Sequence, residues 1–210
     1  LGGYDVYAYY RDASVRAHFW ASGQEARDPN DKYKIAGTIP PPPKLQKTIV
    51  IFPGFTEFCE KYSKEVLSFH ERGYNVLVID WPGQGQSGHF GKHPLAVHCE
   101  DFDHHIGAMD AVVQKAGLDG HDLILFGHSM GGHLALRYAV SRPYYVKAVI
   151  LTAPMMAPPI MPIWLIRLAS YFLSNIGFAR RHPPFHQVLS LDAVRHYRNE
   201  NTLTRDPRGY

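Results

Sequence analysis

Cysteine is scarce in this chain, and its scarcity excludes one class of fold. The 210 residues contain two cysteines, Cys59 and Cys99, too few for the disulfide framework of a small secreted domain. We expect each to be a free thiol within a helix. A reducing compartment fits this composition.

A large excess of charge of one sign is also absent. The formal net charge is +3, from 22 Lys and Arg against 19 Asp and Glu, which is too small to predict a nucleic-acid partner. The hydrophobic fraction of 45% and the charged fraction of 20% are ordinary for a globular protein. The chain is long enough for one domain with a sizeable core.

The chain has no good candidate for a membrane span either. Its apolar stretch 163–176 carries Arg167 near the middle, and an arginine there costs about 2.5–3.5 kcal/mol on insertion scales. Polar side chains gather on one helical face and apolar ones on the other, the latter being Leu165, Leu168, Ala169, Phe172 and Ile176. An amphipathic helix is the better interpretation.

A glycine-flanked serine is the strongest positive signal. Residues 122–140 combine a short apolar run, the pentapeptide Gly127-His128-Ser129-Met130-Gly131 and an apolar stripe of helical spacing. This context of strand, sharp turn and helix is typical of a nucleophile elbow of the G-x-S-x-G type. We therefore expect Ser129 to be a nucleophile, with Gly127 and Gly131 allowing the strand and helix to pass close to it.

Short apolar runs elsewhere predict a sheet. Residues 7–10 and 15–21 suit a hairpin, and 48–52, 75–80 and 146–153 are further strands. Because the runs at 48–52 and 75–80 are continuously apolar and alternate with helices, one expected at about 59–71, they favour a mostly parallel sheet with helices on both faces. The fold class is therefore α/β. Residues 22–47, with four consecutive prolines, read as a surface loop.

Three motifs together resemble one family. Residues 52–62, 80–88 and 127–132 occur in the order and spacing of the α/β-hydrolase fold, and more narrowly resemble the bacterial lysophospholipase and monoacylglycerol lipase group, also classed as serine-aminopeptidase-like hydrolases. The form Pro-Gly-x-x-Glu-x-x-x-Lys-Tyr at 53–62 is similar to the lysophospholipase branch. The resemblance implies that the backbone N–H groups of Phe55 and Met130 form the oxyanion hole.

The resemblance also implies a triad whose acid and histidine follow the serine. The acids after Ser129 are Asp192, Glu200 and Asp206, and the histidines are His133, His182, His186 and His196. Asp192 and His196 fall one turn apart on a single helix, which does not suit a triad, and 201–207 resembles a stretch inside the family's lid. We therefore expect a C-terminally truncated fragment, inactive by itself, in which the triad Asp and His and the last core segment are missing.

These expectations divide the chain in two. Residues 1–153 would be the N-terminal part of the hydrolase core, and 154–210 would begin a helical lid. The apolar face of the lid either packs on the sheet or accepts an acyl chain and touches a membrane surface. Because the chain begins at Leu1, a removed signal is compatible with it, and we expect a protein that is cytoplasmic or peripheral to the inner membrane.

Two other patterns compete with this interpretation. Residues 83–88 fit the G-x-G-x-x-G pattern of a dinucleotide site, but the following residues are loop-like where a helix should open. A second cluster comprises His98, Cys99, Asp101, Asp103, His104 and His105. We interpret its acids as the first turn of a helix rather than as metal ligands, and we expect neither a metal nor a cofactor.

The expected activity is cleavage of an acyl ester of a lysophospholipid by a serine hydrolase, through an acyl-enzyme. The lid residues are rich in arginine and poor in acids, which favours an anionic head group and disfavours an aminopeptidase. A monoacylglycerol lipase or esterase remains an alternative. So does an inactive hydrolase-fold protein that only binds its ligand.

Overall fold

The computed structural model describes residues 3–21, 47–90, 99–120, 122–156 and 162–175. Its elements are β1 (Tyr4–Tyr10), β2 (Ala13–Trp20), β3 (Thr48–Phe52), η1 (Cys59–Tyr62), α1 (Ser63–His70), β4 (Asn75–Ile79), α2 (Asp103–Lys115), β5 (Leu123–His128), α3 (Met130–Ser141), β6 (Val146–Thr152) and α4 (Ile163–Asn175). The surface loop predicted at 22–47, apart from residue 47, and the lid beyond 175 lie outside the described residues. The second region includes Asp192 and His196.

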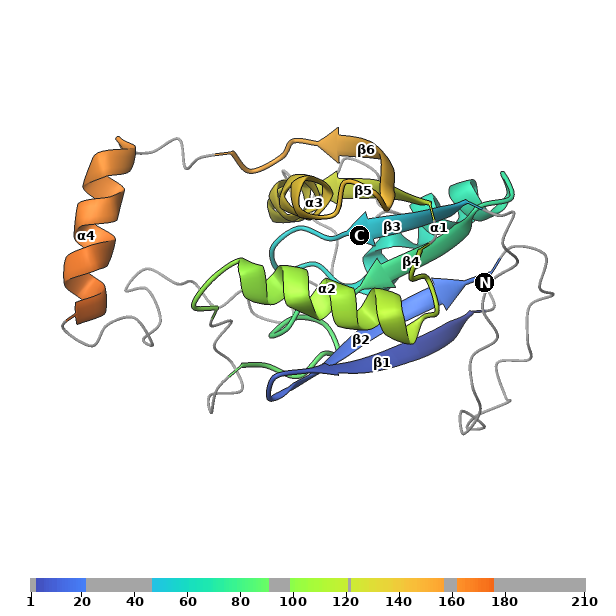
Figure 1. The fold of residues 1–210 in the computed structure, drawn as a ribbon, viewed down its shortest axis with the longest axis horizontal. Coiled ribbons are helices and arrows are strands. Elements are labelled where there is room, and N and C mark those ends of the chain that lie inside the picture. Colours follow the sequence, from blue (N-terminus) through green and yellow to red (C-terminus); the bar gives the residue numbers. More distant parts are fainter. Residues whose placement is uncertain (1–2, 22–46, 91–98, 121, 157–161, 176–210) are drawn as a thin grey trace, which may run out of the picture.

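Six strands form one mixed sheet in the order β1-β2-β4-β3-β5-β6 (Figure 1). Strands β4, β3, β5 and β6 run parallel, whereas β1 and β2 form an antiparallel hairpin that pairs with β4. The hairpin turn is shorter than the sequence predicted, because β2 already begins at Ala13. The mostly parallel sheet expected from the continuous apolar runs is confirmed.

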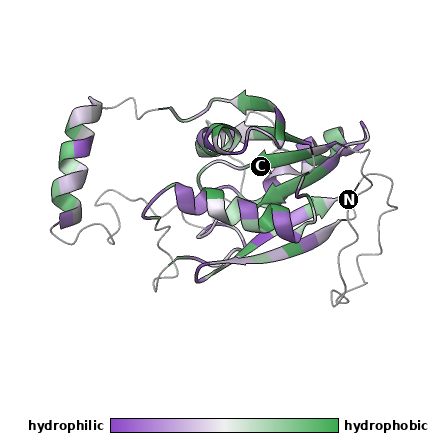
Figure 2. Ribbon diagram, viewed as in Figure 1, coloured by the Kyte–Doolittle hydropathy of each residue, from purple (hydrophilic) through white to green (hydrophobic). Residues whose placement is uncertain are grey.

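Helices cover both faces of the sheet. Every residue of β3 and β4 is buried, and successive side chains enter opposite faces. One face, with Val50 and Leu77, packs against α2 and α3. The other, with Ile49 and Val76, packs against α1 through Val66. The central strands are accordingly the most hydrophobic part of the ribbon (Figure 2).

Two local predictions need correction. The helix expected at about 59–71 is a short 3-10 turn, η1, that continues into α1. Cys99 was expected within a helix, but it lies before α2. The Asp101 carboxylate accepts the Asp103 N–H at 2.8 Å where α2 begins, and Cys99 lies before this turn, outside the helix.

The amphipathic helix predicted at 163–176 is present as α4. It stands apart from the sheet in Figure 1, and its large side chains Trp164, Leu168 and Phe172 are exposed. The described residues therefore do not bury its apolar face. No helix in the described part of the chain is long and apolar enough to cross a membrane.

A buried arginine ties the hairpin to the carboxyl end of β4. Arg16, in β2, is 5% exposed, and its guanidinium contacts Asp5, Glu60 and Asp80 at 3.0, 2.8 and 3.1 Å. Asp80 also accepts the N–H groups of Cys59 and Gln86. One cation therefore joins β1, η1 and the loop after β4, which lies close to the candidate site described below.

This cluster makes stability depend on acid pH. Partial burial alone would raise the pKa of Asp5, but hydrogen bonding to His18 and the charge of Arg16 outweigh burial and hold that pKa below its usual value. A carboxyl group whose pKa is lower in the folded than in the unfolded protein stabilises the fold. This stabilisation is fully present above the unfolded pKa of about 4 and is lost as the pH falls through the folded pKa. We expect the free energy of unfolding to fall below about pH 4, and to fall less steeply in Asp5→Asn. Urea unfolding at several pH values measures both slopes, and identical slopes would contradict this assignment.

Candidate active site

Ser129 lies in the sharp turn between β5 and α3, as the sequence predicted. Its backbone has φ 50° and ψ −117°, a left-handed conformation that costs a non-glycine residue about 1–3 kcal/mol. The chain reverses there, so the serine stands at the carboxyl end of a central parallel strand. Ligands of open α/β sheets bind at this edge.

Close backbone contacts explain the glycines around the serine. A Cβ at Gly127 would lie 2.7 Å from Gly131 O, and a Cβ at Gly131 would overlap the Phe52 carbonyl at the end of β3. A Cβ at Gly132 would lie 2.9 Å from Pro154 Cα. The turn can therefore form only where these positions lack a side chain.

The segment that follows β6 is bound to the backbone of the same serine. The Ser129 N–H donates to Thr152 O at 3.1 Å, and Ser129 O accepts the Met155 N–H at 2.8 Å. Ser129 is thus held from the β6 side as well as by its own strand and helix. This second support maintains the strained turn.

The two predicted oxyanion donors are main-chain groups, one at the start of α3 and one in the loop after β3. Met130 is the first residue of α3, so its N–H has no partner within the helix. Phe55 follows Gly54 in the loop after β3, which is the strand next to β5. Among the described residues, neither N–H donates to a protein acceptor.

Glu57 occupies the interior of the loop after β3. The residue is 8% exposed, and its carboxylate accepts the Gly54 N–H at 2.6 Å, the Lys61 ammonium at 2.5 Å and the Tyr62 hydroxyl at 2.5 Å. Burial alone would raise the pKa of Glu57, but these donors outweigh it and hold the pKa below the usual carboxyl value. Glu57 is therefore a carboxylate at neutral pH.

The two histidines beside the serine point elsewhere. His128 Nδ1 lies 3.0 Å from Thr152 Oγ1, and its Nε2 lies 4.0 Å from Glu57. His133 stacks against Phe102 with ring centroids 5.2 Å apart. No described histidine bonds to Ser129 Oγ. Neither is therefore placed as the base of Ser129, and His128 bridges Thr152 and Glu57.

The glycine-rich loop 83–88 is a structural loop. A Cβ at Gly85 would overlap the Asp80 carboxylate, which accepts the Gln86 N–H at 2.9 Å. The Gly88 N–H donates to Ser14 O at 2.7 Å. These glycines thus allow the loop to wrap around Asp80 and reach the hairpin, and residues 89 and 90, the described residues directly after Gly88, are not helical, whereas a dinucleotide site requires a helix to open there.

Two described members of the cysteine and histidine cluster contact each other. Cys99 Sγ lies 3.1 Å from His105 Nδ1, and burial raises the pKa of the Cys99 thiol while it lowers the pKa of His105 to about 4. Both groups are therefore neutral near pH 7. No group of side chains suited to a metal ion occurs in the described ranges, and His98 lies outside them.

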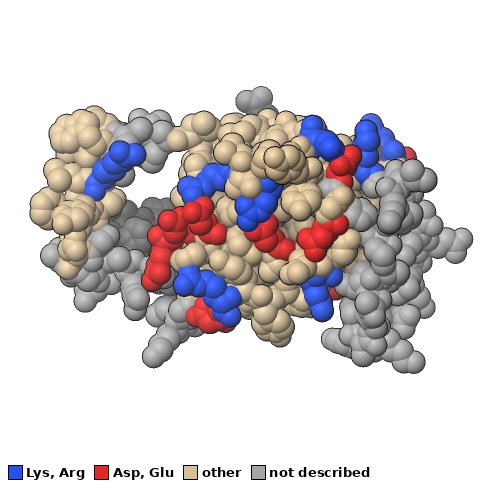
Figure 3. Space-filling view, viewed as in Figure 1, with Lys and Arg blue, Asp and Glu red and all other residues tan. Residues whose placement is uncertain are grey.

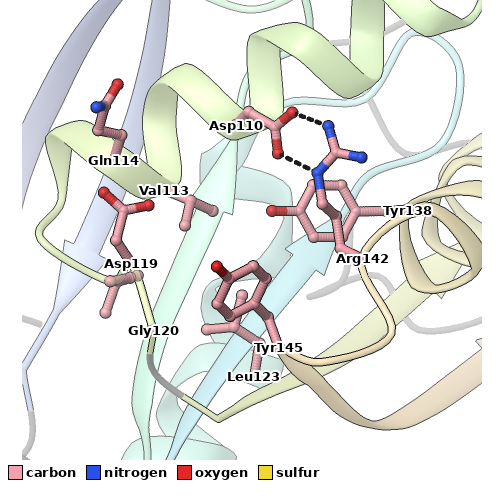
Figure 4. A pocket seen from close by; sticks show the side chains of 10 residues that line it. Asp110, Val113, Gln114, Asp119, Gly120, Leu123, Tyr138, Arg142 and Tyr145 are labelled. Atoms are coloured by element: carbon pink, nitrogen blue, oxygen red, sulfur yellow. Dashed lines mark hydrogen bonds and ion pairs between the residues drawn. The ribbon is translucent and has the colours of Figure 1, made fainter.

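A cavity of about 200 Å³ lies at the opposite edge of the sheet (Figure 4). It adjoins Leu123, the first residue of β5, so it is on the order of 20 Å from Ser129 along the strand. Arg142 forms a two-point ion pair with Asp110, at 2.5 and 3.3 Å. Burial and then the charge of Asp110 raise the pKa of Tyr138. This cavity is not part of the candidate active site.

A wider groove separates α2 from α3 and is lined by residues such as Ile106, His133 and Leu136. Its rim carries the ion pairs Arg137–Asp103 and Arg142–Asp110. Figure 3 shows acidic and basic side chains interspersed on this face. The groove therefore has no field of one sign that would select a charged ligand.

Sequence reasoning missed two charged residues near the site. Glu57 belongs to the Pro-Gly-x-x-Glu form at 53–62, and its signal was its position, because an acid three positions after Gly54 can reach back to its N–H. For Arg16 the sequence predicted only that it lies in a strand. Its signal was a lone cation flanked by Val15 and Ala17 in an apolar strand, because such a charge needs a buried partner.

Comparison with known proteins identifies the family of this chain. A family model described as serine aminopeptidase, S33, matches residues 43–208. Lysophospholipase L2 of Escherichia coli (strain K12) is 30% identical over 142 residues, which cover 66% of this chain and 40% of that protein. Phospholipase YtpA of Bacillus subtilis is 29% identical over 159 residues, covering 75% of this chain and 58% of that protein. The chain therefore spans about half the length of these curated relatives.

Solved structures agree with the fold. A carboxyl esterase from Bacillus coagulans superposes with a TM-score of 0.61 at 17% identity, covering 84% of this chain and 52% of that one. The monoacylglycerol lipase of Paleococcus ferrophilus has a TM-score of 0.50 at 28% identity, covering 62% of this chain and 47% of that one. The fold is that of the α/β-hydrolases.

Proposed function

The chain belongs to the serine aminopeptidase, S33, family of α/β-hydrolases, and on that premise we propose that it is a serine hydrolase that cleaves an acyl ester of a lysophospholipid. The observation that carries the proposal is the strained turn at Ser129, with φ 50°, beside two N–H groups without a described acceptor. This geometry presents a hydroxyl at a sheet edge where an oxyanion can be stabilised. Names of relatives, Lysophospholipase L2 and Phospholipase YtpA, support the lipid substrate.

The proposed reaction has two steps. Ser129 Oγ attacks the ester carbonyl carbon and loses its proton to a base, while the negative charge on the carbonyl oxygen is held by the Phe55 and Met130 N–H groups. Collapse of this intermediate forms the acyl-enzyme and releases the glycerophosphate alcohol, which receives the proton. Water then attacks the acyl-enzyme by the same route and releases a fatty acid.

The base is proposed to be a histidine outside the described residues. His128 bridges Thr152 and Glu57, and His133 stacks on Phe102, so neither is available to Ser129. The family resemblance assigns the base to a histidine oriented by an acid, both following the lid. In that arrangement the histidine accepts the serine proton and later protonates the leaving alcohol.

We further propose that α4 belongs to the lid and contacts the lipid. Its exposed aromatic and aliphatic side chains, among them Trp164, Leu168 and Phe172, suit an acyl chain or the surface of a lipid aggregate. Arg167 is exposed on the same helix and offers a donor to a phosphate. On this proposal the enzyme acts at the membrane surface without crossing it.

Substrate preference distinguishes the proposed lysophospholipase from a monoacylglycerol lipase and from an aminopeptidase. At low salt we expect the full-length protein to prefer a palmitoyl lysophosphatidylglycerol over monopalmitoylglycerol by about tenfold in kcat/KM, the effect of roughly 1.4 kcal/mol from charge-assisted contacts to the phosphate. Salt should reduce the preference. Turnover should rise when the lipid is presented as micelles, because the exposed apolar side chains of α4 can then insert at the lipid–water interface. The measurement is fatty-acid release from both lipids and from an aminoacyl p-nitroanilide.

Arginine variants supply the control. Arg167→Gln should lower the preference for the phosphate, whereas Arg72→Gln, at the far end of α1 where it bonds to Ser68, should leave it unchanged. Equal rates on both lipids at every salt concentration would favour a monoacylglycerol lipase. Hydrolysis of the anilide alone would favour an aminopeptidase.

A further inference from the structure

The loop that carries the Phe55 N–H contains an unusual residue. Gly54 O accepts the Glu57 N–H at 3.3 Å, which makes residues 54–57 a tight turn. Within it, Thr56 has φ 64°, a conformation that glycine adopts readily and a β-branched residue does not. Phe55 and Thr56 are both exposed, so packing of their side chains does not impose this shape. Another contact must hold the turn.

Glu57 makes that contact twice. Its own N–H holds Gly54 O, and its carboxylate turns back to accept the Gly54 N–H at 2.6 Å. The carboxylate lies so close that a Cβ at position 54 would be 2.9 Å from Glu57 Oε2. The N–H and the C=O of Gly54, the glycine of this turn, are therefore bonded to the Glu57 side chain and the Glu57 backbone respectively.

Fixing Gly54 O also fixes the direction of the Phe55 N–H. These two groups belong to the same peptide unit, which is planar and trans, so the N–H points opposite to the C=O. The preceding peptide is anchored as well, since the Trp81 indole donates to Pro53 O at 2.9 Å. Rotation of the Phe55 N–H away from an oxyanion would therefore break bonds to Glu57.

The carboxylate is itself held in place. Lys61 and Tyr62 donate to it from η1, and an ionised carboxylate accepts several such hydrogen bonds at once. Because η1 is bound to the end of β4 through the Cys59 N–H and Asp80, at 2.7 Å, the side chain of Glu57 connects the loop to the rigid sheet.

We infer that Glu57 is a positioning residue for the hydrolase reaction, acting by orienting the Phe55 N–H toward the oxyanion. The inference rests on the proposed function, because it concerns the same site. Glu57 touches neither the substrate nor Ser129 in this role. Its carboxylate acts through the Gly54 N–H, in the peptide next to the one that carries the Phe55 N–H, so its loss should loosen the turn and weaken stabilisation of the tetrahedral intermediate while leaving lipid binding unchanged.

The test is a set of variants of the full-length protein. Glu57→Ala should lower kcat by about 10²-fold, the effect of losing one oxyanion donor, with little change in KM. Glu57→Gln keeps a carbonyl oxygen for the Gly54 N–H and should recover part of the loss. Glu65→Ala, an exposed acid in the first turn of α1, is the matched control and should retain the wild-type kcat.

Two readouts separate positioning from damage to the fold. The rate is divided by the amount of serine that a fluorophosphonate labels at completion, so unfolded molecules do not count. An alkyl trifluoromethyl ketone, which forms a charged tetrahedral adduct with an active serine, should lose affinity in Glu57→Ala by the same factor as kcat/KM.

The outcomes are distinct. Wild-type protein that neither labels nor hydrolyses any ester would overturn the proposed function. Active wild type with Glu57→Ala unchanged per labelled serine, or altered in KM alone, would overturn only the role of Glu57. A parallel loss in kcat and in ketone affinity, partly restored by glutamine, supports it.

Discussion

Replacing Ser129 with alanine is expected to abolish fluorophosphonate labelling and to lower ester turnover by about 10⁶-fold, as loss of a nucleophile does in comparable enzymes. The reason is chemical, since alanine keeps a Cβ in the same strained turn but has no oxygen to form the acyl-enzyme. The fold should persist, because the backbone bonds of residue 129 to Thr152 and Met155 remain. Labelling followed by intact mass measures the result.

A serine in α3, the helix that follows Ser129, provides the control. Ser141 ends α3, and its hydroxyl bonds to backbone carbonyls of Arg137 and Tyr138. Ser141→Ala should label and turn over as the wild type does. Labelling that persists in Ser129→Ala would mean that the nucleophile is elsewhere, and the proposed reaction would be wrong.

The second large effect is on stability. Alanine usually stabilises a helix by about 1 kcal/mol relative to glycine, but Gly131→Ala in α3 should have the opposite effect. Its Cβ would overlap the backbone carbonyls of Phe52 and Pro53, which are held in the sheet and the adjoining loop. We expect a loss of more than about 4 kcal/mol, a size reserved for severe steric conflicts.

Urea unfolding measures this loss. The control is Val140→Ala on the same helix, where the side chain is 81% exposed and the change should stay within about 0.5 kcal/mol. Equal unfolding midpoints for Gly131→Ala and the wild type would show that β3 and α3 can separate without cost. The close approach would then not be needed for the turn at Ser129.

The parts of the fold that could be predicted are those decided by local pattern. The runs at β3 and β4 are apolar at every position but the first residue of each, and all their residues are buried, which only a strand covered on both faces allows. The turn at Ser129 was predictable for a similar reason. Its glycines, strand and helix are adjacent in the sequence, so one short stretch contains most of the geometry.

Residues that act across the chain could not be predicted in this way. The role of Glu57 depends on a side chain folding back onto Gly54, and that of Arg16 depends on Asp80, which is 64 positions away. Hydrophobic periodicity predicts which face of a strand or helix a residue occupies, but it does not predict which group the residue contacts there. The error at Cys99 has a related cause, since the side chain of Asp101 accepts the Asp103 N–H in a turn that precedes α2.

The bonds that join Ser129 to Thr152 and Met155 also have a consequence for the order in which the protein is made. During synthesis the serine leaves the ribosome before β6 and the segment after it, so the turn at first lacks that support. Strand β5 must also find β3, more than 70 residues upstream in the parallel register, which is a slow, non-local step. We therefore expect a nascent chain that ends before Met155 to carry Ser129 in relaxed backbone. On this expectation the proposed nucleophile reaches its strained geometry only after the neighbouring strand has been added.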